Sequence, residues 1–379
     1  MLSGSILGRL YGWWLCSAIF SLLRGVYRPF SRAWPHSAVV NFFRRPPKIE
    51  AWYANSLVSR AIDAVWRLLL RICAAVIGAL RPAAPGSFFV RAASGSWFLR
   101  FEVLFGGFTL LMFIAPHELW SNSYAVLGAA GLFGLAFLMS AAGARRAVYP
   151  REFGLPFLLF VLACLGSLGF TSDRSDSFRV LMFFAAAFLF MFAAYTGLNT
   201  REQLRCVMGF IYAAVILTAV YAFYQRLMGV EVSASFTDLD LNAGVPGRVY
   251  STLDNPNNYA EFLVLFTPLS TAYAMTEKRP FRRLLLSCGI ALPLMALVMT
   301  YSRGCWLAIM VSVVIFVYYA DKRLIPVGVV ACILLIPFLP DSIITRFSTI
   351  FNSHDSSANH RLTTWRGILR MIGDYGLTG

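Results

Sequence analysis

From residue 98 onward the chain alternates long apolar segments with short polar connections. Each apolar segment is close to the length of roughly 17 to 25 residues that a helix needs to cross a bilayer. We predict nine membrane-spanning helices, over residues 99–115, 123–142, 154–170, 178–196, 205–228, 258–275, 284–300, 304–320 and 324–339. The predicted fold class is therefore all-α, a polytopic helical bundle in a membrane.

The longest apolar stretch is interrupted at Tyr301–Ser302–Arg303–Gly304. Its two halves together are too long for one span, and an arginine at the bilayer centre costs on the order of 3 kcal/mol. We therefore expect a tight helical hairpin that turns at Ser302–Arg303–Gly304 and leaves Arg303 at a membrane face.

The first 97 residues follow a different pattern. They hold twelve Lys or Arg and two acids, which gives a net charge of +10. Residues 62–80 have the spacing of an amphipathic helix that turns Arg67 and Arg71 away from its apolar face, typical of a helix lying on anionic lipid. That face is predicted to hold Ile62, Val65, Trp66, Leu69 and Leu70. Residues 6–23 form a second apolar segment, which either lies at the interface or spans.

Composition agrees with a membrane protein and excludes other classes. The chain is 58% hydrophobic and 13% charged, more apolar than a soluble domain needs. The net charge is +15, and the basic residues lie between the apolar segments and in the first 97 residues. Membrane topology and anionic lipid headgroups account for this distribution. We therefore expect no nucleic-acid partner. The seven cysteines lack metal-ligand spacing. We expect no disulfide, no metal and no cofactor.

Charges in the connections predict the orientation. Connections 143–153, 197–204, 276–283 and 321–323, counted with Arg205 at the start of a span, carry eleven Lys or Arg. The intervening connections carry five, counted with Arg179 and Arg226 at span ends. By the positive-inside rule the first set is cytoplasmic. The chain then divides into a basic region with interfacial amphipathic helices, a transmembrane bundle and the start of a large extracytoplasmic loop, over 1–97, 98–339 and 340–379. Arginines also fall on the extracytoplasmic side, against the general bias, among them Arg248, Arg303, Arg361 and Arg366.

These outside arginines could bind an anion. A guanidinium offers phosphate a bidentate pair of hydrogen bonds, although a single arginine such as Arg303 could equally snorkel to the interface. Nearby, Asn255 is either a helix cap before Pro256 or a substrate contact. Glu261 is either an acid stabilised by the helix dipole or a partner of an outside arginine. We predict that His354 and His360 are solvated. The alternative is that either one acts as a general base or a ligand.

Three stretches resemble the O-antigen ligase and O-antigen polymerase superfamily. They are Gly247–Thr252 running into Asn255–Pro256–Asn257, then Tyr301–Ala308, and finally Arg361–Arg366 with Asp374–Gly379. The resemblance extends from about Phe98 to the last residue. It implies a metal-independent glycosyltransferase of the bacterial cytoplasmic (inner) membrane. Such an enzyme moves a glycan from a polyprenyl (undecaprenyl) diphosphate carrier to a hydroxyl or amine of a glycan, lipid or protein acceptor on the outer face.

The resemblance also implies roles for residues. Arg248 and Arg303 match the family's essential arginines and are predicted to be catalytic, stabilising the diphosphate leaving group. The predicted substrate-binding residues are Arg361, Arg366, Asn255 and Glu261. The reaction is expected to be a single displacement with inversion at the anomeric carbon, in which a general base takes the acceptor's proton.

Two other classes stay open. A transporter or flippase for an anionic glycolipid would line its path with the arginines, and should carry charged or helix-breaking residues within several spans. A membrane scaffold would use the basic first 97 residues to recruit partners, but leaves the outside arginines unexplained.

The family's general base is a histidine beyond a glycine-rich continuation of Gly376–Gly379, where this chain stops. We therefore expect a truncated copy, and predict that the purified 379-residue polypeptide does not transfer glycan by itself. An assay with a synthetic lipid-linked donor measures this directly. Detectable transfer would contradict the prediction.

Overall fold

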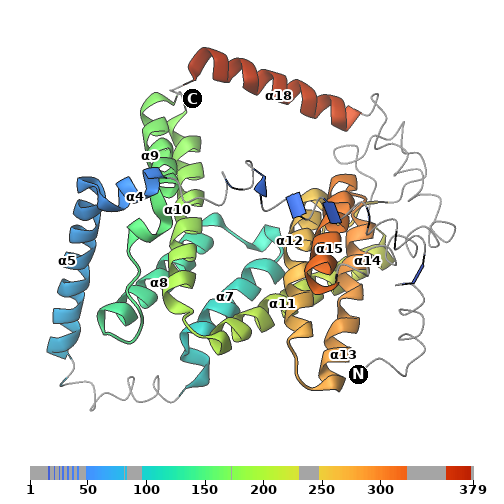
Figure 1. Cartoon of the computed structure of the whole chain (residues 1–379), viewed down its shortest axis with the longest axis horizontal. Coiled ribbons are helices and arrows are strands. Elements are labelled where there is room, and N and C mark those ends of the chain that lie inside the picture. Colours follow the sequence, from blue (N-terminus) through green and yellow to red (C-terminus); the bar gives the residue numbers. More distant parts are fainter. Residues whose placement is uncertain are drawn as a thin grey trace.

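The chain folds into a bundle in which every described element of secondary structure is helical. The structure, a computed structural model, describes residues 48–80, 96–171, 173–229, 247–321 and 356–376, with isolated positions before residue 48 and residue 82. Figure 1 shows helices α8–α10 on one side and α12–α15 on the other, with α7 and α11 running between them.

The helices follow the predicted order. They are α4 (Lys48–Asn55), α5 (Leu57–Leu80), η3 (Trp97–Leu99), α7 (Phe101–Ile114), η4 (His117–Leu119), α8 (Asn122–Ala141), η5 (Pro150–Phe153), α9 (Gly154–Phe170), α10 (Arg174–Gly197), α11 (Arg201–Met228), α12 (Pro256–Met275), α13 (Pro280–Gly289), α14 (Ala291–Met299), α15 (Arg303–Asp321) and α18 (Ser356–Tyr375). α18 runs along the top of the view in Figure 1, and its described side chains are exposed.

Five helical segments are long and apolar enough to cross a membrane: Asn122–Ala141, Pro150–Phe170, Arg174–Gly197, Arg201–Met228 and Pro280–Met299. The prediction of a helical membrane protein is therefore confirmed. Helices also occupy the predicted spans 99–115, 258–275 and 304–320, but that these cross the bilayer remains a prediction. The predicted span 324–339 lies outside the described residues.

A break divides the predicted span 284–300 at Ile290, between α13 and α14. Pro293 explains it, because proline has no amide hydrogen to donate to the carbonyl of Gly289, and its ring clashes with that carbonyl. The segment Pro280–Met299 is still long enough to span.

Two apolar cores hold the bundle together. The first joins α7, α8, α10 and α11 through Phe101, Phe105, Leu132, Ala136, Ala193 and Val207. The second joins α11, α12, α14 and α15 and includes Val215, Val249, Tyr259, Leu263, Leu297 and Trp306. α11 contributes to both, so it fixes the position of one half of the bundle relative to the other.

Four ion pairs lie in or beside the connections predicted to be cytoplasmic. They are Glu102–Arg145 at 3.8 Å, Glu152–Arg146 at 2.8 Å, Asp63–Arg151 at 3.0 Å and Glu277–Arg205 at 2.8 Å. The amide of Arg279 and the charge of Arg205 hold the pKa of Glu277 below its ordinary value. That carboxylate therefore stays charged at neutral pH, and its pairing weakens as the pH falls through the lowered pKa.

A close contact between α7 and α11 predicts a difference between neighbouring glycines. A Cβ on Gly106 would collide with the ring of Phe210, whereas a Cβ on Gly107 would meet nothing within 4 Å. Gly107→Ala should raise stability by about 0.5–1 kcal/mol through helix propensity. Gly106→Ala should lower it by about 1–3 kcal/mol through overpacking. Thermal unfolding in detergent measures both, and equal shifts would contradict the packing described here.

Candidate functional site

The segment from Gly247 to Asn255 is folded into the end of the second core. The Val249 amide donates to the Met299 carbonyl at 3.3 Å, which ties the segment to α14. The Ser251 hydroxyl donates to the Thr218 carbonyl on α11 at 2.7 Å. The Thr252 hydroxyl donates to the carbonyl of Phe113 on α7 at 2.6 Å. Side-chain hydroxyls therefore anchor this connection to buried helix carbonyls.

The side-chain amide of Gln225, near the end of α11, both accepts hydrogen bonds from and donates one to the backbone of the turn at Tyr250–Ser251. Its Oε1 accepts from the amides of Tyr250 at 3.3 Å and Ser251 at 2.8 Å. Its Nε2 donates to the Ser251 carbonyl at 3.1 Å. One amide side chain thus satisfies three backbone groups of the turn, which would otherwise face an apolar core.

The Arg248 side chain is 6% exposed and is held between two turns. Its Nε donates to the Thr300 carbonyl at 2.6 Å, after the end of α14. Its Nη2 donates to Asn257 Oδ1 at 2.7 Å, in the first turn of α12. The guanidinium therefore links the Gly247–Asn255 segment to the two helix ends that the sequence predicted on the same side.

The predicted helix start at Asn255 is confirmed. Asn255 is the N-cap of α12, its side chain accepts from the Asn257 amide at 2.8 Å, and Pro256 opens the helix. This cap orients Asn257, which in turn receives Arg248. The cap does not test the predicted contact of Asn255 with substrate.

The second turn joins α14 to α15 at Thr300–Ser302. Arg303 is the first residue of α15 and its side chain is half-buried, so the turn falls slightly earlier than the predicted Ser302–Arg303–Gly304. The Trp306 indole donates to the Leu297 carbonyl at 3.1 Å across this turn. The Ser302 amide donates to the Thr300 hydroxyl at 3.3 Å.

Backbone strain is concentrated at these two turns. Among described residues other than glycine, a positive φ occurs at Ser251 (53°), Asp254 (59°) and Tyr301 (52°). The left-handed conformation is unfavourable for a side chain as large as tyrosine. Such conformations persist where the surroundings over-determine them, and they cluster at functional sites. The strain therefore marks the same two turns that carry Arg248 and Arg303.

Further charges converge on Cys305, in the first turn of α15. Its thiol lies within electrostatic range of Arg248, Glu261 and Arg361, from three different segments. The structure thus brings together Arg248, Arg303, Asn255, Glu261 and Arg361 at one end of the bundle. Arg366 is exposed further along α18, and no described contact joins it to this group.

Sequence reasoning missed several groups that build the site. Gln225 and Thr300 were not singled out, because a polar residue near the end of an apolar helix is ordinary at a membrane interface. The fully buried hydroxyl of Tyr259 lies beside the Thr218 and Ser251 side chains. His354 and the side chain of His360 lie outside the described part of the chain.

Residues 288–379 match the family model described as O-antigen ligase. The resemblance predicted from the sequence is confirmed over this part of the chain, which contains Arg303, Arg361 and Arg366. Arg248, Asn255 and Glu261 precede the match. It indicates glycan transfer in polysaccharide biosynthesis by a glycosyltransferase-type enzyme of a bacterial membrane. Searches of curated proteins and of solved structures give no match.

The contacts of Gln225 predict how the site unfolds. Gln225→Leu keeps the side chain's size but leaves three backbone groups without their partner, which should cost about 2 kcal/mol or more. Hydrogen exchange of residues 247–255 should become faster, and thermal stability should fall. Leu227→Ala is the control, because Leu227 is 83% exposed on the same helix turn. Unchanged exchange in Gln225→Leu would contradict the role described.

Proposed function

We propose that this chain, whose residues 288–379 match the O-antigen ligase family, is a membrane glycosyltransferase that uses a glycan on a polyprenyl diphosphate carrier. It transfers that glycan to an acceptor hydroxyl or amine at the outer face of the bacterial cytoplasmic membrane. The observation that carries the proposal is the position of Arg248 and Arg303 at two adjacent, strained turns, which Arg248 joins through the Thr300 carbonyl.

The two arginines differ in burial, which suggests different roles. Arg248 is buried and its guanidinium is fixed by the Thr300 carbonyl and Asn257, so its positive charge has a set position. Arg303 opens α15 and is half-buried, so it can reach a ligand at the membrane edge. The preorganised charge of Arg248 costs no reorganisation during the reaction.

The chemistry explains why arginine suits this place. When the acceptor oxygen or nitrogen bonds to the anomeric carbon, the bond from that carbon to the phosphate oxygen breaks. The electron pair stays on the carrier diphosphate, whose charge grows as it leaves. Guanidinium groups keep their charge at any relevant pH and donate to phosphate oxygens in pairs. Arg248 and Arg303 would stabilise that leaving group.

The remaining predicted residues surround this pair. Arg361 reaches the same group of charges from α18, and Glu261 does so from α12. We assign Arg361 and Arg366 to the donor's phosphates, and Asn255 and Glu261 to hydroxyls of the glycan. The acceptor's proton passes to a general base that we do not assign to a described residue.

Sidedness rests on the distribution of charge. The four ion pairs of the basic connections lie in the regions predicted to be cytoplasmic, whereas Arg248 and Arg303 lie in the turns between the other helix ends. A polyprenyl diphosphate in the outer leaflet would present its phosphates at that height.

Binding of the carrier tests the proposal. The full chain in nanodiscs should bind undecaprenyl diphosphate more tightly than undecaprenol, which lacks the phosphates. Arg303→Ala should weaken binding of the diphosphate by about tenfold or more, since a hydrogen bond to a charged group contributes about 1.5–3 kcal/mol. The affinity of Arg303→Lys for the diphosphate should lie between those of the native chain and Arg303→Ala, because lysine keeps the positive charge but cannot donate a bidentate pair of hydrogen bonds.

Arg279→Ala is the matched control for this experiment, because Arg279 is an exposed arginine in a connection predicted to be cytoplasmic. Equal binding of the diphosphate and the alcohol, or equal losses for Arg303→Ala and Arg279→Ala, would refute the diphosphate site. In cells, loss of surface glycan by Arg303→Ala with normal membrane insertion supports transfer. Accumulation of lipid-linked glycan on the inner leaflet would instead indicate a flippase.

A further inference from the structure

The helix α5 is docked on the bundle by one face. Its Trp66 ring packs against Phe133 and Phe137 of α8 and Phe192 of α10, with ring centroids 5.2–6.1 Å apart. The predicted amphipathic face is therefore split, since Ile62, Trp66 and Leu70 are partly buried while Val65 and Leu69 stay exposed.

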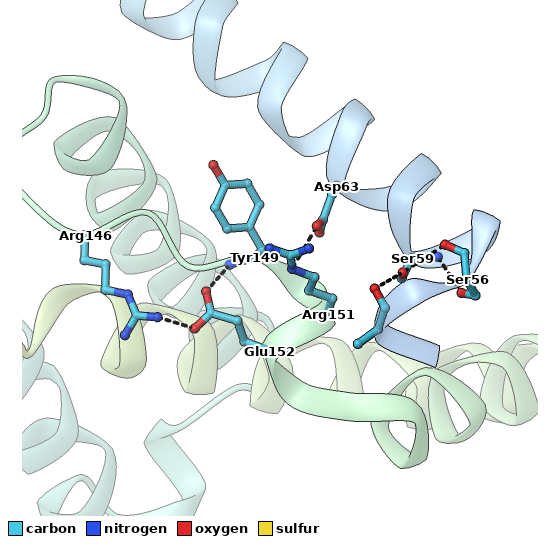
Figure 2. Close-up of polar contacts among 8 residues, drawn as sticks. Ser56, Ser59, Asp63, Arg146, Tyr149, Arg151 and Glu152 are labelled. Atoms are coloured by element: carbon cyan, nitrogen blue, oxygen red, sulfur yellow. Dashed lines mark hydrogen bonds and ion pairs between the residues drawn. The ribbon is translucent and has the colours of Figure 1, made fainter. Parts of the chain in front are cut away.

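An ion pair beside Trp66 connects α5 to η5. The Asp63 carboxylate is 1% exposed and lies 3.0 Å from Nε of Arg151, the second residue of η5 (Figure 2). Burial and the nearby charge of Asp63 raise the pKa of Tyr53 in α4. Glu152, next to Arg151, accepts from the Tyr149 amide at 3.1 Å and pairs with Arg146. The receiving turn is thus itself held rigidly.

Two other faces of α5 have no partner among the described helices. An apolar stripe recurs at spacings of three, four and seven residues and is exposed: Val58, Val65, Leu69, Ile72 and Val76. An arginine stripe recurs at spacings of seven and four: Arg60, Arg67 and Arg71. By helical geometry these two stripes lie on roughly opposite sides of α5, with the docked face between them.

We propose that α5 is an anionic-lipid-binding arm fixed to the bundle at the cytoplasmic face of the membrane. Its apolar stripe contacts acyl chains, and its arginine stripe contacts the phosphates of anionic headgroups. This inference does not depend on the proposed transferase activity, because α5 lies outside the family match and its residues belong to another part of the molecule.

Three observations favour lipid over a protein partner. The docked face of α5, which lies beside the apolar stripe, contacts α8 and α10, and these helices are themselves long and apolar enough to face lipid. The connection that receives α5 is one of the basic set predicted to be cytoplasmic, where the leaflet is anionic. The first 97 residues, which include α5, carry a net charge of +10 and are predicted to lie on the same side, which complements such a surface.

The experiment places a fluorophore on each free face of α5 in the full chain, with the seven native cysteines replaced by alanine. Val76→Cys labels the apolar stripe. Gly78→Cys labels the arginine stripe, seven residues after Arg71, where a side chain meets nothing within 4 Å. Nanodiscs contain either phosphatidylcholine alone or an equimolar mixture with phosphatidylglycerol. Acyl-chain nitroxides should quench the probe at 76 and not the probe at 78, whereas iodide should quench only the probe at 78.

Charge is tested by converting Arg60, Arg67 and Arg71 to glutamine. Nitroxide quenching at 76 should then fall in the anionic nanodiscs, since each arginine removed weakens attraction to an anionic surface by about fivefold. The matched control converts Arg279, Arg282 and Arg283, which carry the same charge at the start of α13, and should leave quenching at 76 unchanged. Salt at about 1 M should mimic the α5 variant by shortening the screening length to about 3 Å.

A second experiment uses the native chain, so that its result does not depend on whether the variants fold. A phosphatidylglycerol with a photoreactive acyl chain should label peptides within 57–80 of the native chain. Absence of that labelling, or equal nitroxide quenching at 76 and 78, would overturn the proposal. A probe at 76 that neither nitroxide nor iodide reaches would overturn it too, and would point to a second copy of the chain covering the stripe.

Discussion

The candidate site depends on the burial of one guanidinium. A charged group removed from water must find hydrogen-bond partners, and Arg248 finds them in the Thr300 carbonyl and Asn257. Each partner is available because a helix ends or begins there. The Thr300 carbonyl lies after the end of α14, and Asn257 is oriented by the Asn255 cap at the start of α12. The strained backbone at Ser251, Asp254 and Tyr301 lies in the two turns that Arg248 joins. Arg248 thus couples the ends of α12 and α14 to the position of one positive charge.

The sequence predicted the helical class, the order of the helices and the turn before Arg303 because those follow from local rules. Long apolar runs must pair their backbone groups within themselves in a bilayer, and an arginine cannot stay at its centre. It also predicted that Asn255 caps α12, since capping depends on a few neighbouring residues.

Contacts between distant segments could not be predicted in the same way. Gln225 lies 26 residues before Ser251 and meets it only because α11 packs beside α12 and α14. The face of α5 was predicted as one apolar surface, but a single helix does not reveal which part of its surface a neighbour covers. Asp63 was counted as one of two acids in a basic region, and its pairing with Arg151 depends on where α9 begins. The role of the site residues in binding substrate stays a prediction.

The length of α11 has a consequence for the depth of the site. With 28 residues it extends about 42 Å, longer than the roughly 30 Å hydrocarbon core of a bilayer. Such a helix tilts or projects from the membrane, and the amount depends on bilayer thickness. Gln225 near its end carries the turn beside Arg248, while Arg205 near its start is paired with Glu277. The depth of Arg248 and Arg303 relative to the lipid headgroups therefore depends on bilayer thickness, because α11 fixes the distance between the site and the Arg205–Glu277 pair.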